Sequence, residues 1–262
     1  MDRFSWLEFG DSGVPSRPHS EEGAPEPHAG TFLARAESLY LEGRYEPALL
    51  EFSRAVAEQR DLFDAWAGQV RCHLAMDELP RARVWANKAL EFFPSAPRVL
   101  SVAGLVAAYQ GQDEEALRFS DQALKLSRGL IPPALWLERA ECLLRSGRLD
   151  AASDCLDMVR SLSGEDPDYR QRIGLVFLGV GAFEQAWLEF QAALERRPDR
   201  AWLWYLSARV AQALQQEDRA RFALERALAL DPALKEARRE HNRLQDSSWT
   251  GWLARLLGRQ FG

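Results

Sequence analysis

The residue types that could perform chemistry are present in this sequence, but they are scattered along it. The three cysteines, Cys72, Cys142 and Cys155, follow no Cys-x-x-Cys spacing, and the four histidines form no metal-binding set. The sequence contains no GxSxG motif, no HExxH motif and no phosphate-binding glycine loop. We therefore expect a protein that is not an enzyme and that carries neither a cofactor nor a metal ion.

Two small groups of these residues have a structural explanation. The acidic run Asp113, Glu114 and Glu115 opens a helical pattern, where carboxylates stabilise the positive end of the helix dipole. Cys142 and Cys155 lie on the two halves of one expected hairpin and could approach each other. Each cysteine nevertheless falls within a helical pattern, in which a buried thiol behaves as a small apolar residue. The sequence favours structural roles for both groups.

The segment 167–198 shows which elements organise the chain. Gly174 and Phe177 lie on one apolar stripe, Gly181 interrupts it, and a second stripe follows before Pro198. This pattern predicts two short amphipathic helices that are joined by a tight glycine turn. Neither helix can bury its stripe alone, so the hairpin needs neighbouring copies of itself.

Copies of this hairpin occur along most of the chain. An alanine recurs at one position of each second helix, where we expect the paired helices to approach closely: Ala48, Ala82, Ala116, Ala152, Ala186 and Ala220. The third and fourth copies are separated by two extra residues, with Ile131, Pro132 and Pro133 in the gap. The six hairpins are expected at about residues 29–62, 63–96, 97–130, 133–166, 167–200 and 201–234.

This pattern resembles the tetratricopeptide repeat, in which a large residue, a small residue, a turn glycine, an alanine and a closing proline recur in order. The closing proline is present only at Pro94, Pro198 and Pro232, and Gln215 replaces the turn glycine of the sixth copy. The resemblance covers roughly residues 29–234. It implies an all-α fold, a right-handed α-solenoid of stacked antiparallel helix hairpins, and a role in binding other proteins.

The resemblance also implies where a partner would bind. In this family, particular positions of the first helix in each unit line a concave groove that holds a peptide or helix of a partner protein. Here those positions select Leu33, Glu37, Tyr40, Arg71, Leu74, Leu105, Tyr109, Leu137, Glu141, Leu144, Leu175, Leu178, Trp202, Tyr205 and Arg209. Such a groove suits an apolar or amphipathic segment, although many of these leucines could instead pack between neighbouring helices. Leu33 and Glu37 stand where one subset of the family has the lysine and asparagine that grip the C-terminal carboxylate of heat-shock chaperones, so we do not expect that partner.

Three regions follow from this interpretation. Residues 1–28 are expected to form a flexible leader, because they are rich in Gly, Pro, Ser and Glu behind an aromatic N-terminal motif. Residues 29–246 should form the solenoid, with a polar closing helix that shields its last apolar face. Residues 247–262 should form an amphipathic C-terminal tail. The two ends supply the terminal anchor motifs Phe4, Trp6, Leu7, Phe9, Trp249, Trp252, Leu253, Leu256, Leu257 and Phe261.

The sequence leaves the role of these two ends open. They could cap the solenoid, or they could bind a groove on another protein. The tail could instead lie on a membrane surface and make the protein a peripheral membrane adaptor, although Arg255 and Arg259 give only modest attraction to lipid. A regulatory subunit of an enzyme complex would use the same groove as an adaptor.

Composition limits the other classes of function. The formal net charge of −6 argues against general nucleic-acid binding, which needs a basic face. No apolar run approaches the length of a membrane-spanning helix, and the first residues do not resemble a secretory signal. We therefore expect a cytoplasmic protein, peripheral at a membrane if the tail binds lipid. The expected function is a non-enzymatic scaffold or adaptor for complex assembly.

Overall fold

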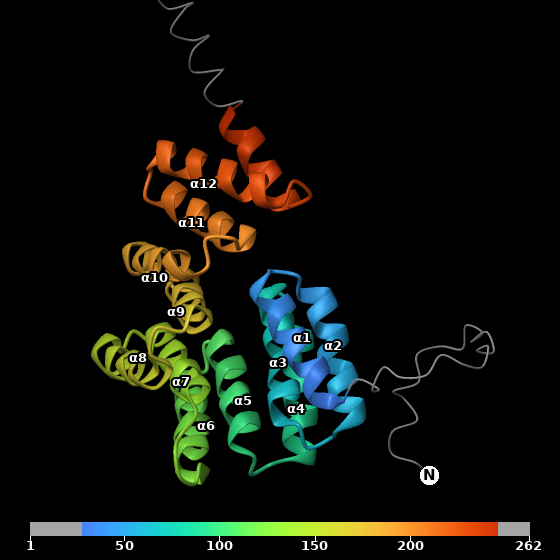
Figure 1. The fold of residues 1–262 in the computed structure, drawn as a ribbon. Helices are drawn as coiled ribbons and strands as arrows, with labels where there is room; N and C mark the ends of the chain where they lie inside the picture. The colour runs from blue at the N-terminus through green and yellow to red at the C-terminus, as the bar shows by residue number, and fades with distance from the viewer. Residues whose placement is uncertain (1–27, 246–262) are drawn as a thin grey trace, which may run out of the picture.

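The computed structural model describes residues 28–245, in which twelve helices pair into six antiparallel hairpins (Figure 1). The hairpins are α1 (Ala29–Leu41) with α2 (Tyr45–Glu58), α3 (Phe63–Ala75) with α4 (Leu79–Phe92), α5 (Pro97–Tyr109) with α6 (Asp113–Leu126), α7 (Pro133–Arg145) with α8 (Leu149–Ser163), α9 (Pro167–Gly179) with α10 (Phe183–Arg196), and α11 (Ala201–Ala213) with α12 (Glu217–Leu230). A further helical segment covers 235–245. The predicted all-α solenoid is confirmed. The predicted leader, tail and terminal anchor motifs lie outside the described residues.

A residue with positive φ ends the first helix of every hairpin. Four of these residues are glycines, with φ between 73° and 77°. Asp77 and Gln215 adopt the same conformation, with φ of 60° and 59°, although their Cβ atoms disfavour it. In each hairpin the next residue donates a backbone hydrogen bond to a carbonyl five positions earlier, as from Gln216 to Ala211 at 2.8 Å. The hairpin geometry therefore overrides the local preference of two turn residues.

Small residues allow the helices to pack closely. The six recurring alanines are at most 1% exposed. The fully buried ring of Phe190 lies so close to Gly174 that an added Cβ on this glycine would be 2.4 Å from the ring. Gly68 has the same relation to Phe52, at 2.3 Å. Glycine is therefore required at positions 68 and 174, and close packing explains the six alanines that the sequence pattern predicts at the second helices.

The two extra residues before α7 break one recurring hydrogen bond. Trp66 Nε1 donates to the carbonyl of Arg60, and Trp204 Nε1 donates to the carbonyl of Pro198, both at 2.9 Å. The equivalent Trp136 Nε1, which follows the two extra residues, is buried and has no hydrogen-bond partner in the described part of the chain. The stack itself continues, since α5 packs against α7.

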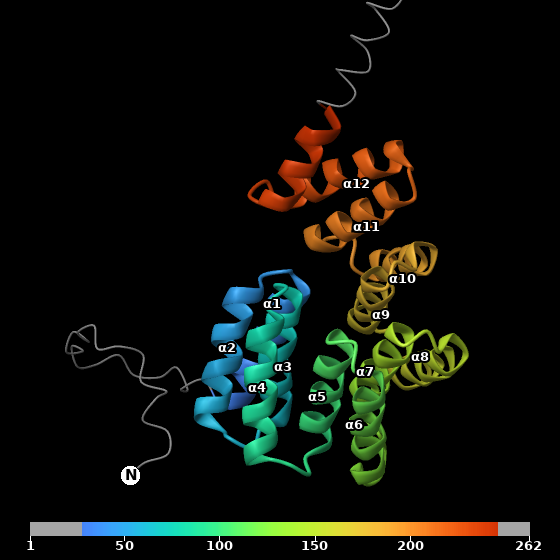
Figure 2. The ribbon, with the colours of Figure 1, turned by 180° about the vertical axis from the view of Figure 1, so that it is seen from behind.

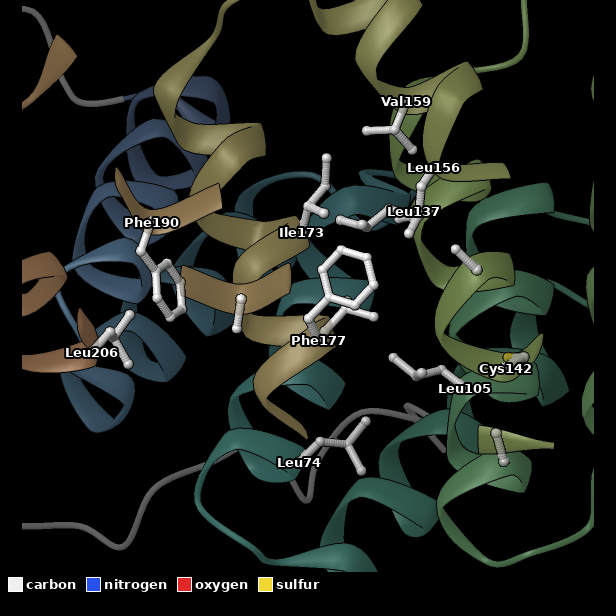
Figure 3. Close-up of a cluster of buried hydrophobic side chains, with 14 of the residues drawn as sticks. Leu74, Leu105, Leu137, Cys142, Leu156, Val159, Ile173, Phe177, Phe190 and Leu206 are labelled. Atoms are coloured by element: carbon white, nitrogen blue, oxygen red, sulfur yellow. The ribbon is translucent and has the colours of Figure 1, made fainter. Parts of the chain in front are cut away.

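Buried side chains form one core from α3 to the helical segment 235–245. Figure 3 shows part of it, with Leu105 of α5 and Leu137 of α7 near Phe177 of α9, and with Phe190 of α10 beside Leu206 of α11. A second core, around Phe52, holds the first two hairpins together. The described part of the chain is thus a packed array rather than a string of separate hairpins.

The array curves so far that its first hairpin meets the fifth and sixth. Figures 1 and 2 show the end of α1 next to α9 and α11 from both sides. Gln171 of α9 donates a hydrogen bond to the carbonyl of Leu41 at 2.7 Å, across 130 positions of sequence. In an open solenoid each repeat contacts only its neighbours. This chain instead closes into a ring.

Candidate functional site

The first helices of all six hairpins surround one pocket of about 260 Å³. Because α1, α3, α5, α7, α9 and α11 each contribute to it, the pocket lies at the centre of the closed ring. The lining residues are Tyr40, Tyr45, Arg71, Leu74, Ala75, Leu105, Tyr109, Leu137, Glu138, Glu141, Arg172, Leu175, Val176, Leu178, Gly179 and Arg209. The pocket therefore has an apolar floor, three tyrosines and five charged side chains.

The structure brings most of the sequence-selected groove residues to this pocket. Ten of the fifteen line it: Tyr40, Arg71, Leu74, Leu105, Tyr109, Leu137, Glu141, Leu175, Leu178 and Arg209. Leu33 and Leu144 pack against the hydrophobic cores instead. Trp202 and Tyr205 are buried, because closure of the ring places Trp202 against the first hairpin. Glu37 is held by two arginines beside the pocket.

Sequence reasoning missed several lining residues. Glu138 and Arg172 occupy the sixth position of their units, on the same helical stripe as the second and ninth positions. A strict helical periodicity would have selected them, whereas the family's groove positions did not. Tyr45 belongs to a second helix and reaches the pocket only because the ring closes, so no local signal could have indicated it.

Glu37 is the centre of one charge cluster at the pocket. Its Oε1 accepts a hydrogen bond from Arg71 Nη2 at 2.8 Å, and its Oε2 accepts one from Arg172. Burial alone would raise the pKa of Glu37, but the positive charges of Arg71 and Arg172 outweigh burial and lower the pKa to about 2. Arg71 also lies over the ring of Tyr40, at 5.2 Å. This cluster joins α1, α3 and α9.

Glu138 is the centre of a second, more deeply buried cluster. It is 4% exposed and accepts hydrogen bonds from Arg98 Nη1 at 2.6 Å and from Ser101 Oγ at 2.5 Å. Arg98 Nε also donates to Asp64 at 2.6 Å. The cluster therefore ties α3, α5 and α7 together beneath the pocket.

Tyr109 and Glu141 line the pocket, and both contact Arg145. The guanidinium of Arg145 lies 3.5 Å from the centre of the Tyr109 ring and donates to Glu141 at 3.2 Å. Burial raises the pKa of Glu141 above its usual range, although the positive charge of Arg145 opposes this shift. Burial also raises the pKa of Tyr109, and the negative charge of Glu141 adds to this shift.

Arg209 differs from the other charged lining residues. It is exposed at the edge of the pocket, and it forms no ion pair with any residue between 28 and 245. The pocket thus combines an apolar floor with one available guanidinium, which is suited to binding rather than to acid or base chemistry.

The other chemistry-bearing residues are structural where the chain is described. All three cysteines are buried, and burial raises the pKa of Cys72 to about 12, which disfavours the reactive thiolate. No group of three or more His, Cys, Asp or Glu side chains in residues 28–245 could hold a metal ion. None of the helices described here has the length and apolar character needed to cross a bilayer.

Comparison with known proteins agrees with the geometry of the hairpins. Models of the tetratricopeptide repeat family match residues 107–172 and 203–234. The chain contains tetratricopeptide repeats. Tetratricopeptide repeats mediate protein–protein interactions, and their scaffold is typically non-catalytic. A solved tetratricopeptide repeat protein from Thermus thermophilus is similar in fold, with 23% identity and a TM-score of 0.50 over 71% of this chain and 99% of that one.

Curated relatives extend the likeness to part of a larger protein. The sequences of anaphase-promoting complex subunit 7 from Arabidopsis thaliana and from Dictyostelium discoideum are each 26% identical to this chain over 174 residues. These residues are 66% of the length of this chain. The chain covers only 30% and 29% of the length of these two relatives.

The Glu37 cluster predicts a specific dependence of stability on pH. Since the pKa of Glu37 is lowered from 4.5 to about 2 on folding, its contribution to stability is complete above about pH 4.5 and is lost as the pH falls towards 2. We expect Glu37→Gln to lower the free energy of unfolding most at pH 6, with a difference from the wild type that shrinks by roughly 1 kcal/mol per pH unit below 4.5. Urea unfolding of both proteins between pH 3 and 6 measures this. A difference that is constant with pH would show that Glu37 is not held by charge.

Proposed function

We propose that the protein is a non-enzymatic scaffold that binds a segment of a partner protein at its central pocket. The observation that carries this proposal is the convergence of all six first helices on one pocket with an apolar floor. Binding sites of this kind use apolar anchors for affinity and a few polar groups for orientation. The curated relatives are, by name, subunits of a complex, which agrees with a scaffold role.

Arg209 indicates the chemistry of the partner segment. Its guanidinium is the charged group at the pocket edge that lacks an ion-pair partner among the described residues. An apolar anchor residue with a neighbouring carboxylate would fill the floor and pair with Arg209. We expect a partner segment of this composition.

Site-specific photocrosslinking tests the proposal. Tyr40 lines the pocket, whereas Phe222 lies exposed on the outer helix α12 and serves as a matched aromatic control. With p-benzoylphenylalanine in place of either residue in cells, we expect one protein to crosslink from position 40 and not from position 222. Equal crosslinking from both positions would contradict binding at the pocket.

Charge reversal gives a second arm of the same experiment. We expect Arg209→Glu to reduce crosslinking from position 40 at least about tenfold, because loss of a charge-assisted contact costs about 1.5–3 kcal/mol. Arg196→Glu on α10, an exposed arginine outside the pocket, should leave crosslinking unchanged. If both reversals had the same effect, the contact would depend on overall charge and not on the pocket.

A further inference from the structure

The contact that closes the ring is specific in its chemistry. We define the closure contact as Glu37, Leu41 and Gly43 of the first hairpin with Gln171, Arg172 and Trp202 of the fifth and sixth. The fully buried Gln171 donates through Nε2 to the Leu41 carbonyl and accepts at Oε1 from Arg200 at 2.6 Å. This carbonyl belongs to the last turn of α1, where helical carbonyls lack a partner within the helix.

Trp202 completes the closure contact through shape. Its indole covers Gly43 so closely that an added Cβ on this glycine would lie 2.2 Å from the ring. The ring of Tyr45 meets the same indole edge-on, with 6.1 Å between centres. A glycine at position 43 therefore serves the closure of the ring as well as the turn of its own hairpin.

The closure contact is nevertheless small. No helix of the first hairpin packs extensively along a helix of the fifth or sixth within the described chain. Closure thus depends on the ion pair between Glu37 and Arg172, the side-chain amide of Gln171 and the indole of Trp202. Contacts of this size can be broken at a cost of a few kcal/mol, which is within the range of functional conformational equilibria.

The junction between α8 and α9 is the weakest part of the stack. These two helices pack more sparsely than the pairs at the other inter-hairpin junctions. Gly164 ends α8 with φ 60° and ψ −133°, a conformation that only glycine adopts readily. An ion pair from Arg160 of α8 to Glu189 of α10 bridges the junction, and Arg160 is partly exposed to water. The junction at residues 164–166 is therefore the place where the last two hairpins can turn while breaking the fewest contacts between consecutive helices.

We propose that the closure contact is a gate, which opens by rotation at residues 164–166 to admit the partner segment. The pocket of the closed ring, about 260 Å³, is below the roughly 300–1,000 Å³ of typical ligand sites. It can hold a side chain, whereas a helix is about 10–12 Å across. Opening would convert the pocket into a groove that is accessible along its length. The nature of the occupant rests on the proposed function, whereas the gate itself does not.

Pulsed dipolar spectroscopy tests the gate without any partner. Glu46 and Glu236 are exposed and line one hollow between the first and last hairpins, so nitroxide labels on Glu46→Cys and Glu236→Cys report closure. The three buried native cysteines are replaced by alanine. We expect one short, narrow distance in this parent protein. Arg172→Glu with Gln171→Ala should shift most of that population to longer, broader distances.

A matched variant separates opening from general loss of structure. Arg139 pairs with Asp121 at 2.5 Å between neighbouring hairpins, so Arg139→Glu breaks an ion pair that does not close the ring. It should leave the short distance in place. If the double variant loses helical circular dichroism, Arg172→Gln alone provides the test. A short distance that persists in folded variants of the closure contact, or a long distance in the parent, would overturn the gate.

The two experiments distinguish a failure of the gate proposal from a failure of the proposed function. If the gate variants keep the short distance while crosslinking at position 40 still depends on Arg209, only the gate is wrong. If the variants open the ring but no protein crosslinks at position 40, the gate stands and the pocket is not the partner site.

Discussion

Phe190→Ala is expected to lower the free energy of unfolding by about 3–5 kcal/mol. The side chain is fully buried between α9 and α10, and its ring contacts the backbone of Gly174 directly. Since Gly174 has no side chain that could move into the space, the cavity will stay open, and the cost should fall towards the upper end of this range. Chemical denaturation followed by circular dichroism measures it.

Leu188→Ala on the same helix is the control for Phe190. Leu188 is 67% exposed, so its truncation should change stability by less than about 0.5 kcal/mol. A small effect at position 190 would mean that the ring does not fill the space over Gly174, and the packing of the fifth hairpin described above would be wrong.

Glu138→Ala is expected to have an effect of similar size, about 3–5 kcal/mol, for an electrostatic reason. The variant leaves the buried guanidinium of Arg98 with only the partly exposed Asp64 as a counter-charge. Removing one member of a buried pair costs more than the pair itself contributes, because the remaining charge stays out of water. Thermal and denaturant unfolding at neutral pH both report this cost.

Two further variants make the test for Glu138 selective. Glu115→Ala breaks an ion pair with Arg118 that is exposed to solvent, and it should cost less than about 1 kcal/mol. Glu138→Gln keeps the acceptor oxygen for Arg98 and Ser101, so it should be milder than Glu138→Ala. Equal effects at positions 115 and 138 would show that the cluster beneath the pocket is open to water.

Much of the fold could be predicted because each hairpin repeats the same local signals. The recurring alanines mark the register of all six units and the turn glycines that of four, and helix bounds from Ala29 to Leu230 fall within the predicted units. Asp77 shows the limit of that reasoning. The second unit turns at this residue with positive φ and without the glycine that marks four of the other turns, because the packing of the hairpin requires this conformation.

The candidate site was only partly predictable, since repeats specify contacts between neighbours but not the curvature of the whole array. Ten groove residues reach the pocket because they share a stripe on their helices. Trp202 stands at another groove position, the second of its unit, yet it is buried against Gly43, since the ring closes there. Contacts between residues so far apart leave no periodic trace in a sequence.

Ring closure has a consequence for how the protein is made. A ribosome adds roughly 5–20 residues per second, so Gly43 emerges on the order of 10–30 s before Trp202, which covers it. During that interval the first hairpin can fold on the second, but Trp202 does not yet cover the Tyr45 ring and the end of α1. The nascent chain thus exposes a surface around Gly43 and Tyr45 that Trp202 covers in the finished protein.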